Sequence, residues 1–178
     1  MMKESKFNVH KMTVLAILTA GAIVIGILES LIPSIGIPGV KLGLSNIVIL
    51  VVLYELGIWE ALLVSLSRVL IVSLVRGTFL SMGFVMSLSG ALFSLGIMIL
   101  FFLLIRRFSI IGVSVVGALF HVFGQIGVAM IYLSTTYVLY YLPIIALSAI
   151  ITGVIVGISA QLIISTKVIS KQKEKYKF

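Results

Sequence analysis

No Asp, Glu, Lys or Arg occurs in residues 108–166, which read FSIIGVSVVGALFHVFGQIGVAMIYLSTTYVLYYLPIIALSAIITGVIVGISAQLIIST. A helix needs about 20 mostly apolar residues to cross the hydrocarbon core of a bilayer, so this segment is long enough for two crossings. We expect a break at residues 134–143, where tyrosines form an interfacial aromatic belt: Tyr132, Tyr137, Tyr140 and Tyr141. The segment therefore predicts two membrane helices joined by a turn at the membrane surface.

The composition of the whole chain extends this conclusion. Of its 178 residues, 61% are hydrophobic and 10% are charged, and the mean hydropathy is +1.34, whereas a soluble domain has about 25% charged residues. These values predict an integral protein of the cell membrane. The net charge of +8 does not indicate a nucleic-acid partner, because the cations gather beside apolar segments, where they set topology and contact membrane lipids. Cysteine is absent, which excludes disulfides and thiolate chemistry.

Four more apolar segments precede this one. They cover residues 12–28, a short stretch between Lys41 and Glu55, residues 59–75 with Arg68 inside, and residues 77–105. The sequence thus predicts an all-α membrane protein, a six-transmembrane-helix bundle in a single domain. Residues 1–11 form a basic tail, residues 12–165 the bundle and residues 166–178 a second basic tail. The basic start and the apolar run after it imitate a signal peptide, but no clean small-residue cleavage site follows, so we expect a retained first helix.

Orientation follows from the cations, since short loops rich in Lys and Arg stay in the cytoplasm. With six helices, both termini and the loop between the fourth and fifth helices share one side. All ten cations in these parts then face the cytoplasm: Lys3, Lys6, Lys11, Arg106, Arg107, Lys167, Lys171, Lys173, Lys175 and Lys177.

Three cations remain: Lys41 and Arg76 at outer helix ends, and Arg68 within the third helix. A charge at the bilayer centre costs roughly 2.5 to 3.5 kcal/mol, so such a residue usually has a partner or a task. The chain has no Asp and only five Glu, so cations outnumber counter-ions. Two interpretations stay open for each cation. Arg68 forms a structural ion pair with Glu29 or binds an anion, and Lys41 and Arg76 are interfacial anchors or ligand contacts.

Uncharged polar residues point to the same outer half of the bundle. Asn46 follows Lys41 by just over one turn, and His121 and Gln125 lie four residues apart, on one helix face that also carries glycines. Small residues beside polar ones indicate a face that packs against other helices. Interhelical hydrogen bonds and ligand contacts are both open for this pair. The candidate ligand-binding residues are Glu29, Lys41, Asn46, Arg68, Arg76, His121 and Gln125, and no catalytic residue, metal ligand or cofactor is predicted.

The first helix carries Ala16 and Ala20 four residues apart, beside Gly21. Such a strip allows close approach of another helix, from this chain or from a partner. Gly153 and Gly157 have the same spacing. Alone, this pattern does not decide between internal packing and partner docking.

Several motifs in order carry a family resemblance: ESLIP at 29–33, PGVKLGL at 38–44 with Asn46, EALLV at 60–64 leading to Arg68, GTF at 77–79, and GVS at 112–114 leading to His121 and Gln125. Over about residues 12–165 the chain resembles the Gx transporter family, often labelled heptaprenyl diphosphate synthase component I. That family is similar in turn to the S components of energy-coupling factor (ECF) vitamin transporters.

The resemblance implies a six-helix bundle with cytoplasmic termini and a ligand site toward the outer side, with the loop at residues 33–41 as its lid. It also implies that Ala16 and Ala20 dock on an ECF T subunit, with ATPase subunits as further partners. The chain itself has no GxxxxGK[ST] phosphate loop. One residue departs from the pattern: Val122 stands where an Asn is expected after the histidine.

The enzyme label conflicts with the composition. Prenyl elongation needs magnesium held by several carboxylates, normally from paired aspartate-rich motifs, and this chain contains no Asp. We therefore predict no enzyme, but a substrate-binding and translocation subunit for a small anionic or amphipathic solute taken up from outside. Two alternatives remain: a non-catalytic membrane accessory of polyprenyl diphosphate or quinone metabolism, and a scaffold for an extracytoplasmic redox system.

Overall fold

The computed structural model describes residues 9–31, 43–104 and 108–166, and these contain helices and turns without any strand. The elements are α1 (Val9–Leu31), α2 (Asn46–Glu55), α3 (Ile58–Val75), α4 (Met82–Leu104), α5 (Ile110–Leu133), the short 3-10 helix η1 (Tyr137–Tyr141) and α6 (Leu142–Ser165). The predicted all-α architecture is confirmed.

Five of these helical segments are long and apolar enough to cross a membrane: α1, α3, α4, α5 and the continuous stretch Tyr137–Ser165. The prediction of two helices within residues 108–166 is confirmed. They separate at Ser134, which adopts the left-handed conformation and ends α5. The four tyrosines around this break are all exposed, as expected of an interfacial belt. The chain is thus a multi-pass membrane protein.

Helix α2 differs from the other five. It has ten residues, which span about 15 Å, half the hydrocarbon core. All side chains from Val48 to Leu53 are buried, because α1, α3, α5 and α6 surround the helix. The described residues contain the six predicted α-helices, whereas a sixth membrane crossing stays a prediction.

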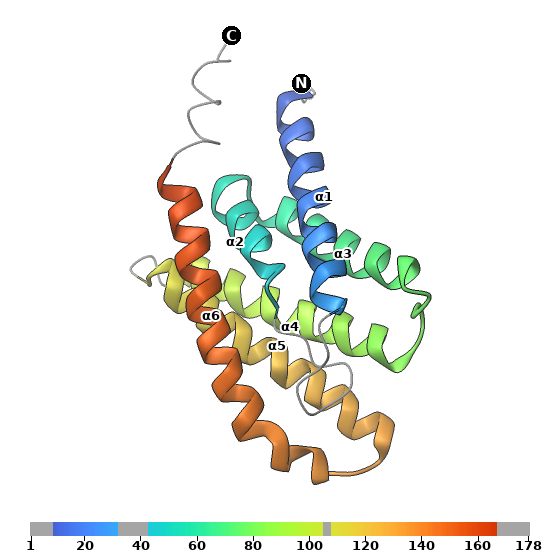
Figure 1. Ribbon diagram of the computed structural model, residues 1–178. Coiled ribbons are helices and arrows are strands. Elements are labelled where there is room, and N and C mark those ends of the chain that lie inside the picture. Colours follow the sequence, from blue (N-terminus) through green and yellow to red (C-terminus); the bar gives the residue numbers. More distant parts are fainter. Residues whose placement is uncertain (1–8, 32–42, 105–107, 167–178) are drawn as a thin grey trace, which may run out of the picture.

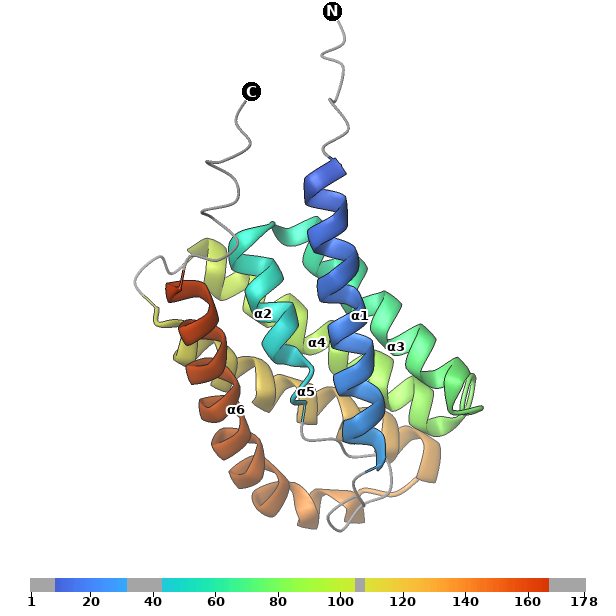
Figure 2. The ribbon, with the colours of Figure 1, turned by 45° about the horizontal axis from the view of Figure 1, so that its top comes forward.

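Figures 1 and 2 show α2 near the middle of the bundle, with α4, α5 and α6 packed in sequence order and α1 beside α3. The beginning of α1 and the end of α6 lie toward the same end of the bundle in both views. Which side of a membrane this end faces stays a prediction. The single-domain division is likewise a prediction.

Close helix contacts hold the α4, α5 and α6 group together. A Cβ on Gly124 would lie 2.9 Å from the Ser89 carbonyl oxygen, and the Ser89 hydroxyl donates to the Gly124 carbonyl at 2.9 Å. Gly153 and Gly157 meet the α5 backbone at Val115 and Ile111, where added Cβ atoms would lie 2.8 and 2.6 Å from the Cα atoms. Gly153 and Gly157 therefore serve the internal packing of α6 against α5.

Helix α1 exposes the other small-residue strip. Ala16 and Ala20 are exposed, and a Cβ added to Gly21 would meet nothing within 4 Å. Near its start, α1 is tied to α3 by an ion pair between the Lys11 ammonium and the Glu60 carboxylate. The Glu60 carboxylate is therefore engaged by a cation that lies 49 positions earlier in the chain.

Candidate ligand-binding site

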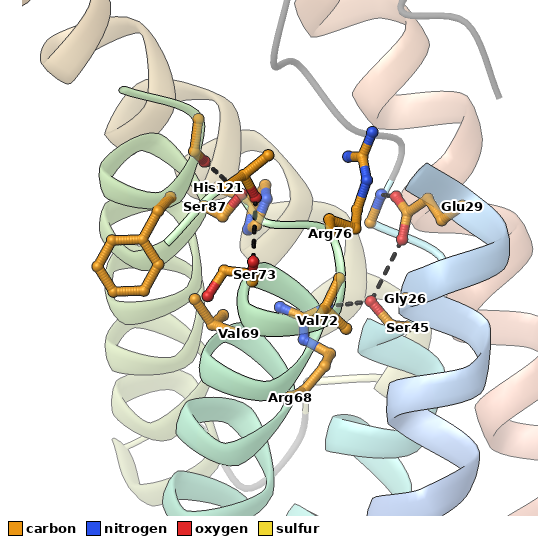
Figure 3. A pocket seen from close by; sticks show the side chains of 14 residues that line it. Gly26, Glu29, Ser45, Arg68, Val69, Val72, Ser73, Arg76, Ser87 and His121 are labelled. Carbon is orange, nitrogen blue, oxygen red and sulfur yellow. Dashed lines mark hydrogen bonds between the residues drawn. The ribbon is translucent and has the colours of Figure 1, made fainter. Parts of the chain in front are cut away.

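A cavity of about 80 Å³ lies among α1, α3, α4, α5 and the turn that precedes α2 (Figure 3). This space is large enough for several water molecules or a small polar group. Its charged lining residues are Glu29, Arg68 and Arg76, and among the described residues no cluster of three or more possible metal ligands occurs.

Arg68 is deeply buried, with 7% of its surface exposed, as is Glu29 with 6%. Gly26 of α1 gives it room, because a Cβ there would lie 3.6 Å from Arg68 Cγ and 3.1 Å from Val72 Cγ2. The Arg68 Nη1 group donates a hydrogen bond to the Ser45 hydroxyl. A guanidinium has five N–H donors, and Ser45 is its only hydrogen-bond acceptor within the described part of the chain.

Glu29 connects the end of α1 to the turn before α2. Its Oε1 accepts from the Gly43 backbone N–H, and its Oε2 accepts from the Ser45 hydroxyl at 3.3 Å. Gly43 has a φ of 77°, a left-handed conformation that favours glycine. We call Glu29, Gly43, Ser45 and Arg68 the arginine cluster. In it, Glu29 and Arg68 do not form the direct ion pair that was one interpretation of Arg68; the Ser45 hydroxyl bonds to both side chains instead.

Arg76 follows the last residue of α3 and is exposed at the margin of the cavity. Figure 3 shows its side chain extending away from the Arg68 guanidinium. With two guanidiniums and one carboxylate among its described lining residues, the cavity carries net positive charge. Arg76 is positioned both to anchor the helix end and to attract an anion.

His121 lines the same cavity from α5, whereas Gln125 is fully buried one turn further on. The Gln125 Nε2 group donates to His121 Nε2 over 3.2 Å. This bond lies within α5, so it is not the interhelical hydrogen bond that was one of the two interpretations for this pair. Both side chains pack against Gly90, where a Cβ would lie 3.0 Å from each.

Asn46 begins α2 and is buried, but it does not line the cavity of Arg68. It lines a second pocket, which has almost no free volume and which we call the closed pocket. The structure thus brings Glu29, Arg68, Arg76 and His121 to one cavity and leaves Asn46 and Gln125 outside it. Lys41 and the predicted lid at residues 33–41 lie outside the described residues.

Sequence reasoning missed Ser45, the hydroxyl that joins Glu29 to Arg68. Its position directly before Asn46, between a left-handed glycine and a helix start, is the signal that could have identified it. Val122, for which the resemblance led us to expect an Asn, packs in an apolar cluster with Met86 and Ile126. This position therefore contributes hydrophobic packing in this chain.

One comparison with known proteins gives a match. The family model described as heptaprenyl diphosphate synthase component I matches residues 18–163, a range that runs from α1 into α6 and includes every described residue of the cavity. No curated protein and no solved structure matches the chain.

Proposed function

The chain belongs to the heptaprenyl diphosphate synthase component I family, and we propose that it is a substrate-binding membrane subunit of the ECF S-component type. In this proposal it binds a small anionic or amphipathic solute from outside the cell and has no catalytic activity of its own. The observation that carries the proposal is the buried Arg68 guanidinium, which faces a cavity of net positive charge.

Burial makes this guanidinium a strong anion receptor. An arginine in a low-dielectric interior loses hydration, and charge-assisted hydrogen bonds to a carboxylate or phosphate offset that loss. Glu29 supplies only part of the compensation, because Ser45 separates it from Arg68. A planar, bidentate anion fits the remaining guanidinium donors, and the Arg76 charge at the margin attracts the anion inward.

The exposed strip on α1 supports a partner subunit in the same proposal. Ala16 and Ala20 are exposed with Gly21 beside them, and a helix can approach closely over such small residues. An ECF T subunit would dock there, and ATPase subunits would supply the energy for uptake. The beginning of α1 and the end of α6 would then face the cytoplasm, because positive charge gathers in the tails beside them.

The family description favours a second candidate, a membrane accessory that delivers a precursor to a soluble prenyl synthase. The absence of Asp from the chain supports a helper rather than the synthase itself. Purification from host membranes separates the two candidates, because transport predicts T and ATPase subunits in the complex and the accessory role predicts a synthase. A redox scaffold would co-purify with neither the transport subunits nor a synthase, and it would bind no ligand saturably.

The decisive experiment asks whether Arg68 holds a solute. The protein is purified from its own host in mild detergent, and native mass spectrometry identifies retained small molecules in the wild type, Arg68→Lys and Lys11→Ala. We expect an anionic molecule in the wild type and its loss from Arg68→Lys, because an ammonium replaces the bidentate guanidinium with a point charge.

Lys11→Ala is the matched control, since it removes a cation from an ion pair that does not line the cavity. It should retain the molecule. Equal retention in Arg68→Lys, or no retained anion in any protein, contradicts the proposed function.

A further inference from the structure

The turn at residues 43–46 separates two pockets and contributes to both. Ser45 lines the cavity of Arg68, Asn46 lines the closed pocket behind it, and Gly43 lines both. The Asn46 N–H donates to the Gly43 carbonyl at 2.9 Å, which fixes the turn. Gly43 has no side chain, so it contributes only backbone to the walls of both pockets.

The closed pocket lies among α2, α4, α5 and α6. Its walls come from small or slender side chains and one flexible one: Gly43, Asn46, Met98, Ser114, Ala118, Gly153 and Val156. Its free volume is about 0 Å³, so no water fits in this structure. Met98 is the adaptable wall, because its unbranched thioether side chain changes rotamer readily.

Two buried oxygens in this pocket, Asn46 Oδ1 and Ser114 Oγ, have no hydrogen-bond partner within the described structure. Asn46 is 5% exposed and Ser114 is 3% exposed, so bulk solvent does not satisfy them. Leaving such groups unpaired costs about 1 to 3 kcal/mol each. The pocket therefore contains polar groups whose hydrogen bonds the described protein does not satisfy.

The Ser114 hydroxyl is also unusual among the helix hydroxyls of this chain. A buried serine in a helix commonly donates to the carbonyl three or four residues earlier, as Ser87 does to Gly83 and Ser73 to Leu70. Ser114 makes no such bond, and neither does Ser94 on the facing helix α4. These hydroxyls are thus not satisfied by their own helices.

We propose that the pocket of Asn46 and Ser114 is a second ligand subsite, which receives an N–H or O–H donor group of the solute whose anionic group binds Arg68. An amide oxygen accepts hydrogen bonds only, so Asn46 selects a donor rather than a second anion. Movement of Met98 opens the pocket, and the solute passes Gly43 to reach both subsites. This inference rests on the proposed function and narrows its solute to a molecule with an anion at one end and a donor at the other.

The test uses ω-aminoalkyl phosphates of increasing chain length and the matching alkyl phosphates, which lack the amine. Binding to the full-length protein in detergent is measured by titration calorimetry. For at least one chain length, the wild type should bind the amino compound about tenfold more tightly than its matched alkyl phosphate, as expected for one added hydrogen bond to a buried acceptor. In Ser114→Ala this ratio should fall toward one.

Ser159→Ala is the control, because its hydroxyl bonds its own helix and lines neither pocket; it should keep the wild-type ratio. A wild-type ratio near one at every chain length overturns the second subsite without depending on any variant, and an unchanged ratio in Ser114→Ala does so as well. Phosphates that bind neither the wild type nor the control count against the arginine site itself. Binding without discrimination counts only against the subsite.

Discussion

The two sides of the turn at residues 43–46 hold buried polar groups in different states. On one side, the arginine cluster is a connected chain in which Arg68 donates to Ser45, and Ser45 and the Gly43 N–H donate to Glu29. On the other side, Asn46 Oδ1 and Ser114 Oγ are equally buried but have no partner in the described structure. Connected groups fix the fold, whereas unpartnered groups in a pocket mark a place that another molecule is expected to complete.

Removal of Glu29, which accepts hydrogen bonds from both the Gly43 N–H and the Ser45 hydroxyl, should lower the free energy of unfolding most. Glu29→Ala removes the acceptor of the Gly43 N–H and of the Ser45 hydroxyl, together with the negative charge that Ser45 links to the buried Arg68. Loss of one charge from such a buried network costs about 3 to 5 kcal/mol. The free energy of unfolding in mixed micelles should fall by that amount. Glu29→Gln keeps an acceptor oxygen and should lose less. A loss below about 1 kcal/mol in Glu29→Ala would mean that the cluster does not hold α1 to the turn.

Removal of the bridging hydroxyl should have a smaller effect. Ser45→Ala deprives the Arg68 N–H of its acceptor and one Glu29 oxygen of its donor, which predicts a loss of about 2 kcal/mol in the same unfolding measurement. Ser159→Ala is the reference, because its hydroxyl bonds only its own helix. Equal stability of these two variants would show that the serine bridge is not a structural link.

Across the turn, a serine that is buried to a similar degree should tolerate the same change. Ser114→Ala removes a hydroxyl without a partner, so the free energy of unfolding should change by about 0.5 kcal/mol or less, or rise slightly. This would be an exception to the usual cost of substitution at a buried position. A loss as large as that of Ser45→Ala would show that Ser114 has a partner and that the contrast is wrong.

The smallest effect on stability is expected outside both the arginine cluster and the pocket of Asn46 and Ser114. Ala20→Leu adds a side chain to the exposed face of α1, so unfolding should change by about 0.5 kcal/mol or less. Under the proposed function, the same variant should lose T and ATPase subunits during purification, because leucine keeps the partner helix at a distance. Thr13→Ala, on a neighbouring exposed turn, is the control and should keep them.

Much of the fold follows from segment length alone. The long charge-free run predicts α5 and α6, and its tyrosines mark the turn between them, because bilayer thickness dictates how long an apolar helix must be. Helix α2 shows the limit of this reasoning. Hydropathy predicts that this helix exists. It does not predict what surrounds the helix, because an apolar helix of ten residues has the same composition in lipid and inside a protein.

The charged residues of the candidate site could be predicted from the sequence, whereas the hydrogen bonds that join them could not. Arg68 and Glu29 stand out because charges are rare in membrane helices, but the serine between them depends on how three segments meet. The unusual state of Ser114 is likewise invisible in sequence, since it depends on a hydroxyl that does not bond its own helix. Its place on one stripe with Gly117, His121 and Gln125 was the available signal.

The enclosure of α2 has a consequence for biosynthesis. Insertion machinery that releases helices into lipid recognises a segment by its apolar length, and α2 is about half as long as that recognition requires. Its walls include α5 and α6, which the ribosome makes after α2. We therefore expect α2 to settle into place after the C-terminal helices emerge, so that an early-translated segment completes the assembly of the protein.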